Sequence, residues 1–156
     1  LFARTRPQAL AALGLIALGV QPEQRVGIAS GTRVEWIFAD LAIMCAGGAT
    51  TTVYPTTISE DVSYILADSE CRVVFAEDSS QLEKLTKHRS ELPHLAKVVL
   101  FEGEGDGDWV ITLEDLSGEF GVSRERVRQI EVRAFEKVQE AVKRNLAGIE
   151  APRASA

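Results

Sequence analysis

Cysteine is scarce in this chain of 156 residues, which contains only Cys45 and Cys71. Two thiols so far apart form neither a CxxC motif nor a metal-ligand pair. This argues against a disulfide-stapled secreted fold and favours reduced thiols in a cytoplasmic protein. Histidine is equally scarce. His88 and His94 have no Cys or Glu at a metal-ligand spacing, so we expect two surface histidines and no metal site.

Long apolar runs are also missing, because none approaches the roughly 20 residues that a membrane-spanning helix needs. No membrane partner is therefore expected. Residues 9–20 follow Arg4 and Arg6 in a way that superficially fits a signal peptide. However, Gly14 and Gly19 interrupt the run and no small-residue cleavage site follows, so the segment is predicted to be a core-facing helix.

A general excess of positive charge is absent. The net charge is -6, from 17 Lys and Arg against 23 Asp and Glu, which argues against a generally basic nucleic-acid-binding surface. Residues 1–110 hold 9 basic against 15 acidic residues and carry the whole excess, because residues 111–156 hold 8 of each. The one locally positive stretch is residues 122–144, with 7 basic and 4 acidic residues.

Short β-branched runs alternate with helix-favouring segments through the first two thirds of the chain. Helices are predicted at residues 8–18 and 34–46, from an N-cap at Ser59 onward, and from a cap at Ser79 or Ser80 to residue 91. Strands are predicted at residues 25–29, 50–54, 72–76 and 97–101. This alternation predicts an α/β fold, with a partial parallel sheet of about four strands and flanking helices. A Gly-rich acidic loop follows at residues 102–108, and beyond it Leu113, Leu116 and Phe120 have helical spacing.

Residues 9–115 resemble the N-terminal part of long-chain acyl-CoA synthetases, in the AMP-forming adenylate superfamily. The resemblance lies in ALGLIALGVQPEQRVGIAS, RVEWIFADLAIMCAGGATTTVYPT and ILADSECRVVFAED. It implies an ATP-phosphate loop ending in Lys, a downstream Thr-Glu segment and a catalytic Lys in a mobile C-terminal domain. None of these occurs in the 156 residues, so no catalytic residue, no cofactor and no enzyme activity are expected.

The turn Ser30-Gly31-Thr32 joins a predicted strand to a predicted helix and could offer backbone N–H groups to an anion. It has neither further glycines nor a following Lys, so it does not match a phosphate-binding loop. Ordinary helix capping is the alternative interpretation.

Residues 112–142 (TLEDLSGEFGVSRERVRQIEVRAFEKVQEAV) resemble the C-terminal region of bacterial heat-shock-type sigma factors. The spacing of Ser117, Gly121, Val127 and Ile130 suits a helix-turn-helix, with Ser123 capping the second helix. The resemblance implies that four residues of that helix read the upstream promoter hexamer: Arg124, Glu125, Arg128 and Gln129. Arg126 and Arg133 are expected to meet phosphate. A solvated charged helix face is the alternative.

These observations predict a chimera, engineered, generated or naturally fused, with a join near residues 111–116. Its parts would be a truncated synthetase-like α/β segment at residues 1–110, an all-helical helix-turn-helix tail at 111–146 and a disordered tail at 147–156. The predicted function is weak promoter DNA binding. The alternative is a protein-binding inhibitor or antitoxin-like neutraliser, and a residual adenylating-enzyme fragment ranks last. Expected partners are promoter DNA or a protein, either RNA polymerase or a neutralised target. Self-association is expected through apolar surface left uncovered by the missing parts.

Overall fold

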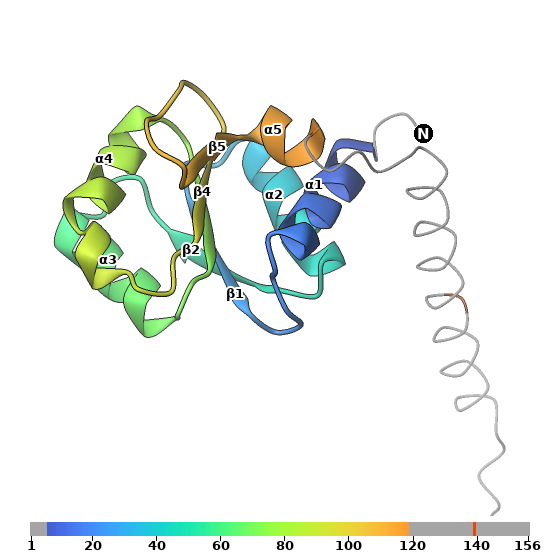
Figure 1. The fold of residues 1–156 in the computed structure, drawn as a ribbon, viewed down its shortest axis with the longest axis horizontal. Helices are drawn as coiled ribbons and strands as arrows, with labels where there is room; N and C mark the ends of the chain where they lie inside the picture. Colours follow the sequence, from blue (N-terminus) through green and yellow to red (C-terminus); the bar gives the residue numbers. More distant parts are fainter. Residues whose placement is uncertain (1–5, 119–138, 140–156) are drawn as a thin grey trace, which may run out of the picture. The chain divides into compact units, whose positions relative to one another are not determined.

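A computed structural model of the chain describes residues 6–118 and residue 139. Chain contacts divide the protein into two units, Leu1–Gly121 and Val122–Ala156, and the fold described below is that of the first. Its elements follow one another as helices and parallel strands (Figure 1): α1 (Arg6–Ala17), β1 (Arg25–Ala29), α2 (Val34–Cys45), β2 (Ala49–Val53), α3 (Ser59–Asp68), β3 (Val73–Ala76), α4 (Ser79–Lys87), the short 3-10 helix η2 (Arg89–Glu91), β4 (Lys97–Leu100), β5 (Val110–Thr112) and α5 (Leu113–Gly118).

The sheet has five parallel strands in the order β2-β1-β3-β4-β5. The predicted α/β class is confirmed, and each of the four predicted strands lies within one residue of its predicted bounds. The fifth strand was not predicted. Val110–Thr112 is only three residues long and precedes leucines at helical spacing, so the local pattern does not indicate a strand.

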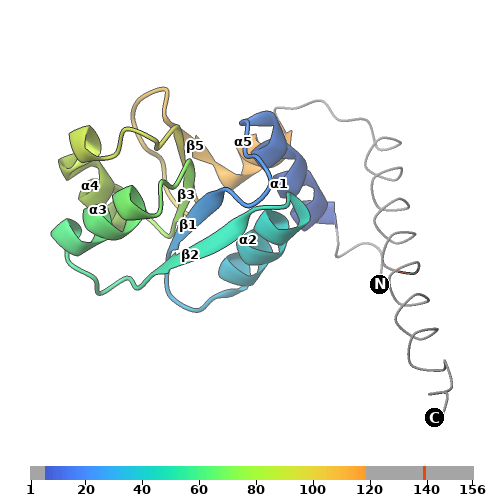
Figure 2. The same cartoon turned by 90° about the horizontal axis from the view of Figure 1, so that it is seen from below.

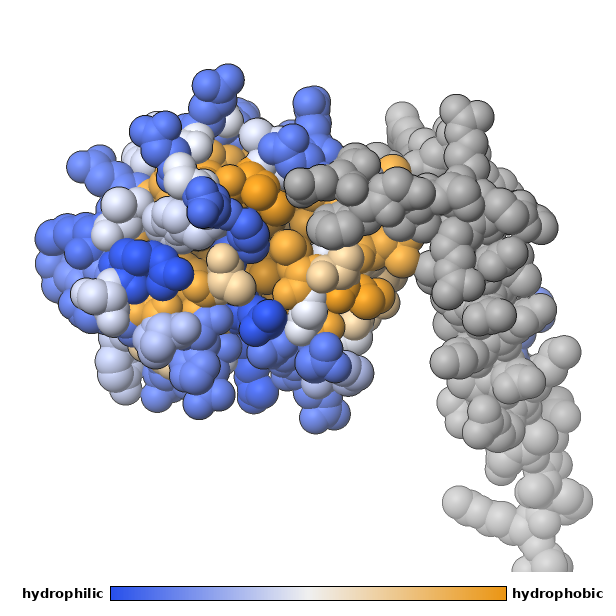
Figure 3. Space-filling model, viewed as in Figure 1, coloured by the Kyte–Doolittle hydropathy of each residue, from blue (hydrophilic) through white to orange (hydrophobic). Residues whose placement is uncertain are grey.

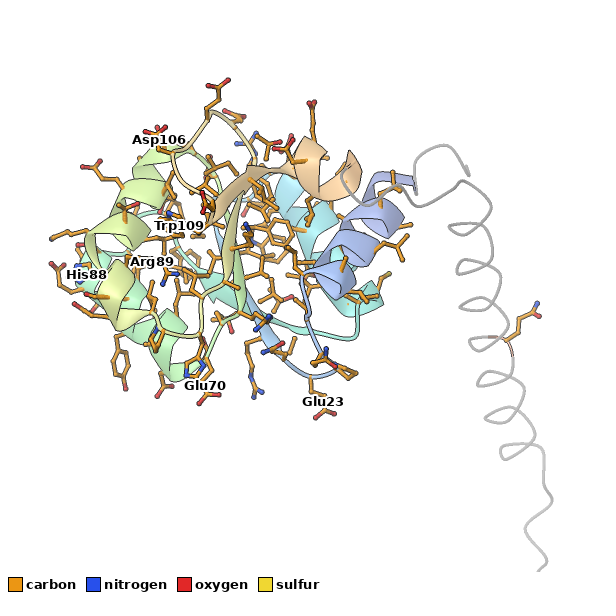
Figure 4. The ribbon with its side chains drawn as sticks, in the orientation of Figure 1. Glu23, Glu70, His88, Arg89, Asp106 and Trp109 are labelled. Atoms are coloured by element: carbon orange, nitrogen blue, oxygen red, sulfur yellow. The ribbon has the colours of Figure 1, made fainter. Side chains whose placement is uncertain are left out.

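Contacts from the preceding segments hold β5 beside β4. The Arg89 guanidinium lies 5.1 Å from the centre of the Trp109 ring (Figure 4), and it donates to the carbonyls of Leu92 at 2.8 Å and Leu95 at 3.0 Å. Lys97 Nζ donates to the carbonyl of Asp108. These contacts fix the chain on both sides of β4 and bring Val110 into register with Val98. The fifth strand therefore depends on tertiary contacts and not on local propensity.

Helices cover both faces of the sheet (Figure 2). Alternate residues of β3 point to opposite sides. Val73 and Phe75 join the core beneath α1, α2 and α5, whereas Val74 and Ala76 join the core beneath α3 and α4. All four are fully buried, which explains why the strand is continuously apolar. In Figure 3 hydrophilic residues cover α3 and α4, while apolar residues gather around β5 and α1.

The predicted join at residues 111–116 lies inside this α/β unit. Ile111 belongs to β5, and Leu116 of α5 is fully buried in the same core as Leu15 of α1. The two helices approach closely, because a Cβ added at Gly14 would lie 2.7 Å from Leu116 Cδ1 and nearer still to the Leu116 carbonyl. The helical spacing of Leu113 and Leu116 therefore serves the α/β core. The rest of the predicted helix-turn-helix lies outside the described residues.

Two predicted helix caps differ from the structure. The cap of α4 is Asp78, whose carboxylate accepts from the backbone N–H groups of Ser80 at 2.9 Å and Gln81 at 3.2 Å. The hydrogen bond that the Ser80 hydroxyl donates to Asp78, supported by the two backbone N–H groups, lowers the pKa of Asp78. The N-cap of α3 is Ile58, which makes no side-chain cap bond, and Ser59 is the first helical residue. The helix at residues 8–18 is confirmed as core-facing, with Ala11, Ala12 and Leu15 buried.

Among the residues that the structure describes, no helix is both long and apolar enough to cross a bilayer.

Candidate functional site

The carboxyl ends of the strands lie along one edge of the sheet. Glu23 and Glu70, which precede β1 and β3, mark the opposite, amino edge, and the loop that carries Asp106 lies on the carboxyl side (Figure 4). β1 and β3 are neighbours at the middle of the strand order. From β1 the chain passes through α2 to β2, toward one end of that order, whereas from β3 it passes through α4 to β4, toward the other end. Ligands of open α/β sheets bind at such a reversal. The residues that follow β1 and β3 therefore form the candidate site.

The chain's own Glu77 fills the anion position at this reversal. Its Oε2 accepts from the Gly31 backbone N–H at 2.7 Å and from Ser30 Oγ at 3.2 Å. The turn Ser30-Gly31-Thr32 thus does bind a carboxylate, but it is that of Glu77, the residue directly after β3. The alternative interpretation, that this turn caps the following helix, is wrong. The N-cap of α2 is Arg33, and no side-chain cap bond is present.

Arg33 joins three carboxylates, one from α2 and two from the loops that follow β3 and β4. Its guanidinium donates to Glu35 at 2.7 Å and to Glu77 at 3.5 Å, and it also pairs with Glu102. The hydrogen bond to Glu35, followed by that to Glu102, raises the pKa of Arg33, and the same bond lowers the pKa of Glu35. Three carboxylates around one guanidinium leave a net negative site, which opposes binding of a nucleotide phosphate here.

A cavity of about 190 Å³ lies beside this cluster. It is lined by residues from the ends of β1 and β2 and the start of α2: Ser30, Gly31, Thr32, Trp36, Thr52, Val53 and Tyr54. Pockets that enclose a whole drug-sized ligand usually measure about 300–1,000 Å³. The cavity is therefore too small to enclose an acyl-adenylate.

A second polar cluster ties α3 to α4 on the other side of the sheet. Lys87 Nζ pairs with Glu60 at 2.9 Å, and Ser63 Oγ donates to Glu91 at 2.9 Å. His88 Nδ1 lies 2.9 Å from the other oxygen of Glu91, and the His88 side chain is only 13% exposed. The prediction of two surface histidines is thus right for His94 and wrong for His88, which these helices cover.

Lys84 and Gln81 of α4 hold the loop that follows Tyr54, a residue of the cavity wall. Lys84 Nζ donates to the carbonyls of Pro55 at 2.6 Å and Thr57 at 2.9 Å, and Gln81 Nε2 donates to Pro55 at 3.3 Å. These contacts were not visible in the sequence, since they join residues of different helices and loops. These hydrogen bonds hold the backbone of the loop in place. They do not pair a nucleophile with a base.

The predicted DNA-contacting residues all lie outside the described part of the chain: Ser123, Arg124, Glu125, Arg126, Arg128, Gln129 and Arg133. Their contacts stay a prediction from the sequence. Within residues 6–118 and residue 139, no three His, Cys, Asp or Glu side chains are grouped so that they could hold a metal ion.

The free energy of unfolding is expected to decrease as the pH falls from about 4.5 to about 2. Carboxylates whose pKa is lower in the folded state stabilise the fold above their unfolded pKa and lose this effect as they are protonated. Lys87 donates a hydrogen bond that lowers the pKa of Glu60 from 4.5 to about 2, and His88 lowers that of Glu91. Urea unfolding across this window measures the effect.

Lys87→Met is the matched variant for this pH series. Without the ammonium group, the pKa of Glu60 should return toward its ordinary value, so the loss of stability below pH 4.5 should be smaller. Identical acid profiles for the wild type and the variant would contradict this assignment.

Comparison with known proteins finds similarity to AMP-binding enzymes. The family model described as "AMP-binding enzyme" matches residues 6–147. The long-chain-fatty-acid–CoA ligase FadD15 of Mycobacterium bovis is 43% identical over 95 residues, which are 61% of this chain and 16% of that protein. The chain therefore spans only about a sixth of the length of this curated relative.

Two solved structures share the fold. Acetoacetyl-CoA synthetase from Streptomyces lividans has a TM-score of 0.65 and 27% identity, over 74% of this chain and 20% of that one. The anthranilate CoA ligase AuaEII, solved with anthranoyl-AMP, has a TM-score of 0.67 and 24% identity, over 74% of this chain and 22% of that one. At that identity, the second similarity establishes the fold alone.

These comparisons correct the predicted function. The family match crosses the predicted join at residues 111–116 and includes residues 123–133, and it is to an enzyme family that binds AMP. Nothing in the comparisons supports a sigma-type helix-turn-helix, and promoter DNA binding as the function is wrong. The protein-binding alternative is displaced by the same finding. The resemblance to acyl-CoA synthetases is confirmed, and the adenylating-enzyme interpretation that ranked last fits best.

Proposed function

Because the chain belongs to the AMP-binding enzyme family, we propose that its α/β unit is a scaffold segment of a ligase that joins long-chain fatty acids to CoA through an acyl-adenylate. The observation that carries this proposal is the 43% identity to a long-chain-fatty-acid–CoA ligase. This identity extends over 95 residues, which is most of the length of the α/β unit described at residues 6–118.

The carboxyl edge supports the role of a scaffold. The Gly31 N–H, which could face a phosphate, is bound to Glu77, and Arg33 is surrounded by three carboxylates. The adjacent cavity is too small for an adenylate. In this proposal the groups that bind ATP and form the acyl-adenylate belong to the rest of the ligase, and this unit supplies five strands of its sheet.

A graft into FadD15 of Mycobacterium bovis tests the proposal. The FadD15 segment that matches this chain is replaced by this chain's residues, and acyl-CoA formation from a long-chain fatty acid, ATP and CoA is measured. We expect the graft to retain kcat/KM within about tenfold of FadD15, a difference of about 1.4 kcal/mol in transition-state stabilisation. The 156-residue chain alone should release no pyrophosphate above background.

Two matched grafts separate folding from function. Glu83→Ala changes an exposed residue of α4 and should leave the activity of the graft unchanged. Phe75→Ala removes a fully buried side chain at the centre of the sheet and should abolish activity together with the cooperative melt. A graft that melts like FadD15 but forms no acyl-CoA would refute the proposal, as would pyrophosphate release by the chain alone.

A further inference from the structure

Residues 103–107, here named the strap, lie in the connection from β4 to β5 on the carboxyl side of the sheet, where Asp106 is labelled in Figure 4. They form most of the Gly-rich acidic loop at residues 102–108, in which every residue is exposed. Within the part of the chain that the structure describes, the backbone N–H groups of residues 103–106 donate no hydrogen bond. A segment with so few hydrogen bonds can open without unfolding the strands on either side of it.

The middle of the strap nevertheless rests closely on the core beside α4. A Cβ added at Gly105 would lie 2.6 Å from Val110 Cγ1, 2.7 Å from Leu82 Cδ2 and 3.4 Å from Leu100 Cδ1. Leu82 and Leu100 are only 9% and 1% exposed. No larger residue fits at these distances, so Gly105 lets the backbone of the strap lie directly on the three apolar side chains.

Both ends of the strap are anchored to the sheet. Before it, the Glu102 carboxylate pairs with Arg33, and the Glu102 N–H donates to the carbonyl of Glu77 at 3.0 Å. After it, the carbonyl of Asp108 accepts from Lys97 Nζ. The strap is therefore held at its ends by polar contacts and in its middle by apolar packing.

Glycines stand at the two points where the strap meets these anchors. Gly103 and Gly107 have positive φ values of 85° and 96°, which glycine adopts without the cost that other residues incur. A Cβ at Gly103 would meet no atom within 4 Å, so it is the backbone conformation, and not a lack of space, that requires glycine there. Residues at the ends of a loosely bonded segment can absorb the change of backbone angles when the segment moves.

We propose that the strap is a hinged cover on the edge of the core beside α4. It turns about Gly103 and Gly107, lifts Gly105 away from the side chains beneath it, and is latched by the pair of Glu102 with Arg33. The latch can release, because the Glu102 side chain is 63% exposed and an exposed ion pair contributes little stability. Opening uncovers apolar side chains while the strands of the sheet stay folded.

The inference is independent of the proposed ligase function, because it concerns a motion within the α/β unit and not its chemistry. A failure of the labelling experiment below would leave the FadD15 graft unaffected.

Thiol labelling of the full chain measures the opening. Leu100→Cys places a thiol under the strap, in a Cys45→Ser background that lacks the exposed native thiol. Its alkylation by iodoacetamide is followed by mass spectrometry. Leu85→Cys is the matched control, because Leu85 is also 1% exposed but is not among the nearest neighbours of Gly105. We expect the Leu100→Cys thiol to react at least about tenfold faster than the Leu85→Cys thiol, since local opening reaches only the first.

Gly105→Ala should lift the strap. The added Cβ meets Val110 and Leu82 too closely, so the labelling rate of the Leu100→Cys thiol should rise about tenfold or more. Glu104→Ala is the control, because it changes an exposed neighbour on the same strap and should leave the rate unchanged.

Arg33→Met removes the latch and should raise the labelling rate of the Leu100→Cys thiol about two- to fivefold. Glu35→Gln is the control for this variant, because Glu35 also pairs with Arg33 but lies in α2 and not beside the strap. The labelling rate of the Leu85→Cys thiol should stay the same in all of these variants.

NMR relaxation of the backbone amides in the wild-type chain tests the hinges without any substitution. We expect exchange on the microsecond-to-millisecond timescale at residues 103–107 and none in β4. Rigid amides throughout residues 103–107 would overturn the proposal. So would equal labelling of the Leu100→Cys and Leu85→Cys thiols, or an equal rise of both in Gly105→Ala, because global unfolding alone would then expose them. An unchanged rate in Arg33→Met would refute the latch.

Discussion

Leu116→Ala is expected to lower the free energy of unfolding of the α/β unit by about 2–5 kcal/mol. Leu116 is fully buried, and it shares a core with Ala11, Ala12 and Leu15 of α1 and with Val99 of β4. Truncation removes the transfer free energy of the side chain and leaves a cavity between α5 and α1 that the packed helices close only in part. Urea unfolding monitored by far-UV circular dichroism measures the change.

Glu114→Ala on the same helix is the control for this substitution. The Glu114 side chain is exposed and makes no hydrogen bond to the described residues, so its replacement should change stability by no more than about 0.5 kcal/mol. If Leu116→Ala were as mild as Glu114→Ala, α5 would not belong to the α/β core. The predicted join at residues 111–116 would then again mark a boundary between two parts.

Gly14→Val should destabilise the same contact from the side of α1, by about 1–3 kcal/mol or more. A Cβ at this position would lie 2.7 Å from Leu116 Cδ1 and 2.8 Å from Leu116 Cγ, and the backbone carbonyl of Leu116 is nearer still. A flexible side chain could move aside, but a carbonyl cannot do so without shifting α5 as a whole. Thermal and urea unfolding measure the loss.

Ala17→Val supplies the matched control, because it adds the same β-branched side chain at an exposed position of α1. It should lower stability only by the difference in helix propensity, less than about 0.7 kcal/mol. The double variant Gly14→Val/Leu116→Ala should show a coupling of about 0.5–3 kcal/mol, since the alanine relieves the side-chain part of the clash. Strict additivity would mean that the two residues do not touch.

The local elements of the fold were predictable because each is determined by neighbours in sequence. Residues 25–29 and 72–76 are apolar runs of strand length bounded by turn residues. A continuous apolar run is typical of a strand that helices cover on both faces. The helix at residues 34–46 follows from its own periodicity and from the glycines Gly47 and Gly48 that end it. The resemblance to acyl-CoA synthetases rests on the residues of these same elements, and the comparisons with known proteins confirm it.

The candidate site was not predictable to the same degree. Ser30-Gly31-Thr32 was visible as a turn that could bind an anion, but the anion itself, Glu77, is 46 residues away in sequence from Gly31. The three carboxylates around Arg33 come from α2, the end of β3 and the end of β4. Only the order of strands in the sheet brings them together, because the carboxyl ends of parallel strands meet at one edge.

The amino-acid sequence by itself determined the α/β class, the bounds of four strands and the ligase resemblance, since all three rest on residue identity and local periodicity. Tertiary structure alone decided where Leu113 and Leu116 pack. Helical spacing marks the apolar side of a helix but does not say which core that side meets, so the same residues suited a helix-turn-helix equally well. The structure resolved this through Gly14, which lets α5 approach α1, and through β4, whose hydrogen bonds make a strand of Val110–Thr112.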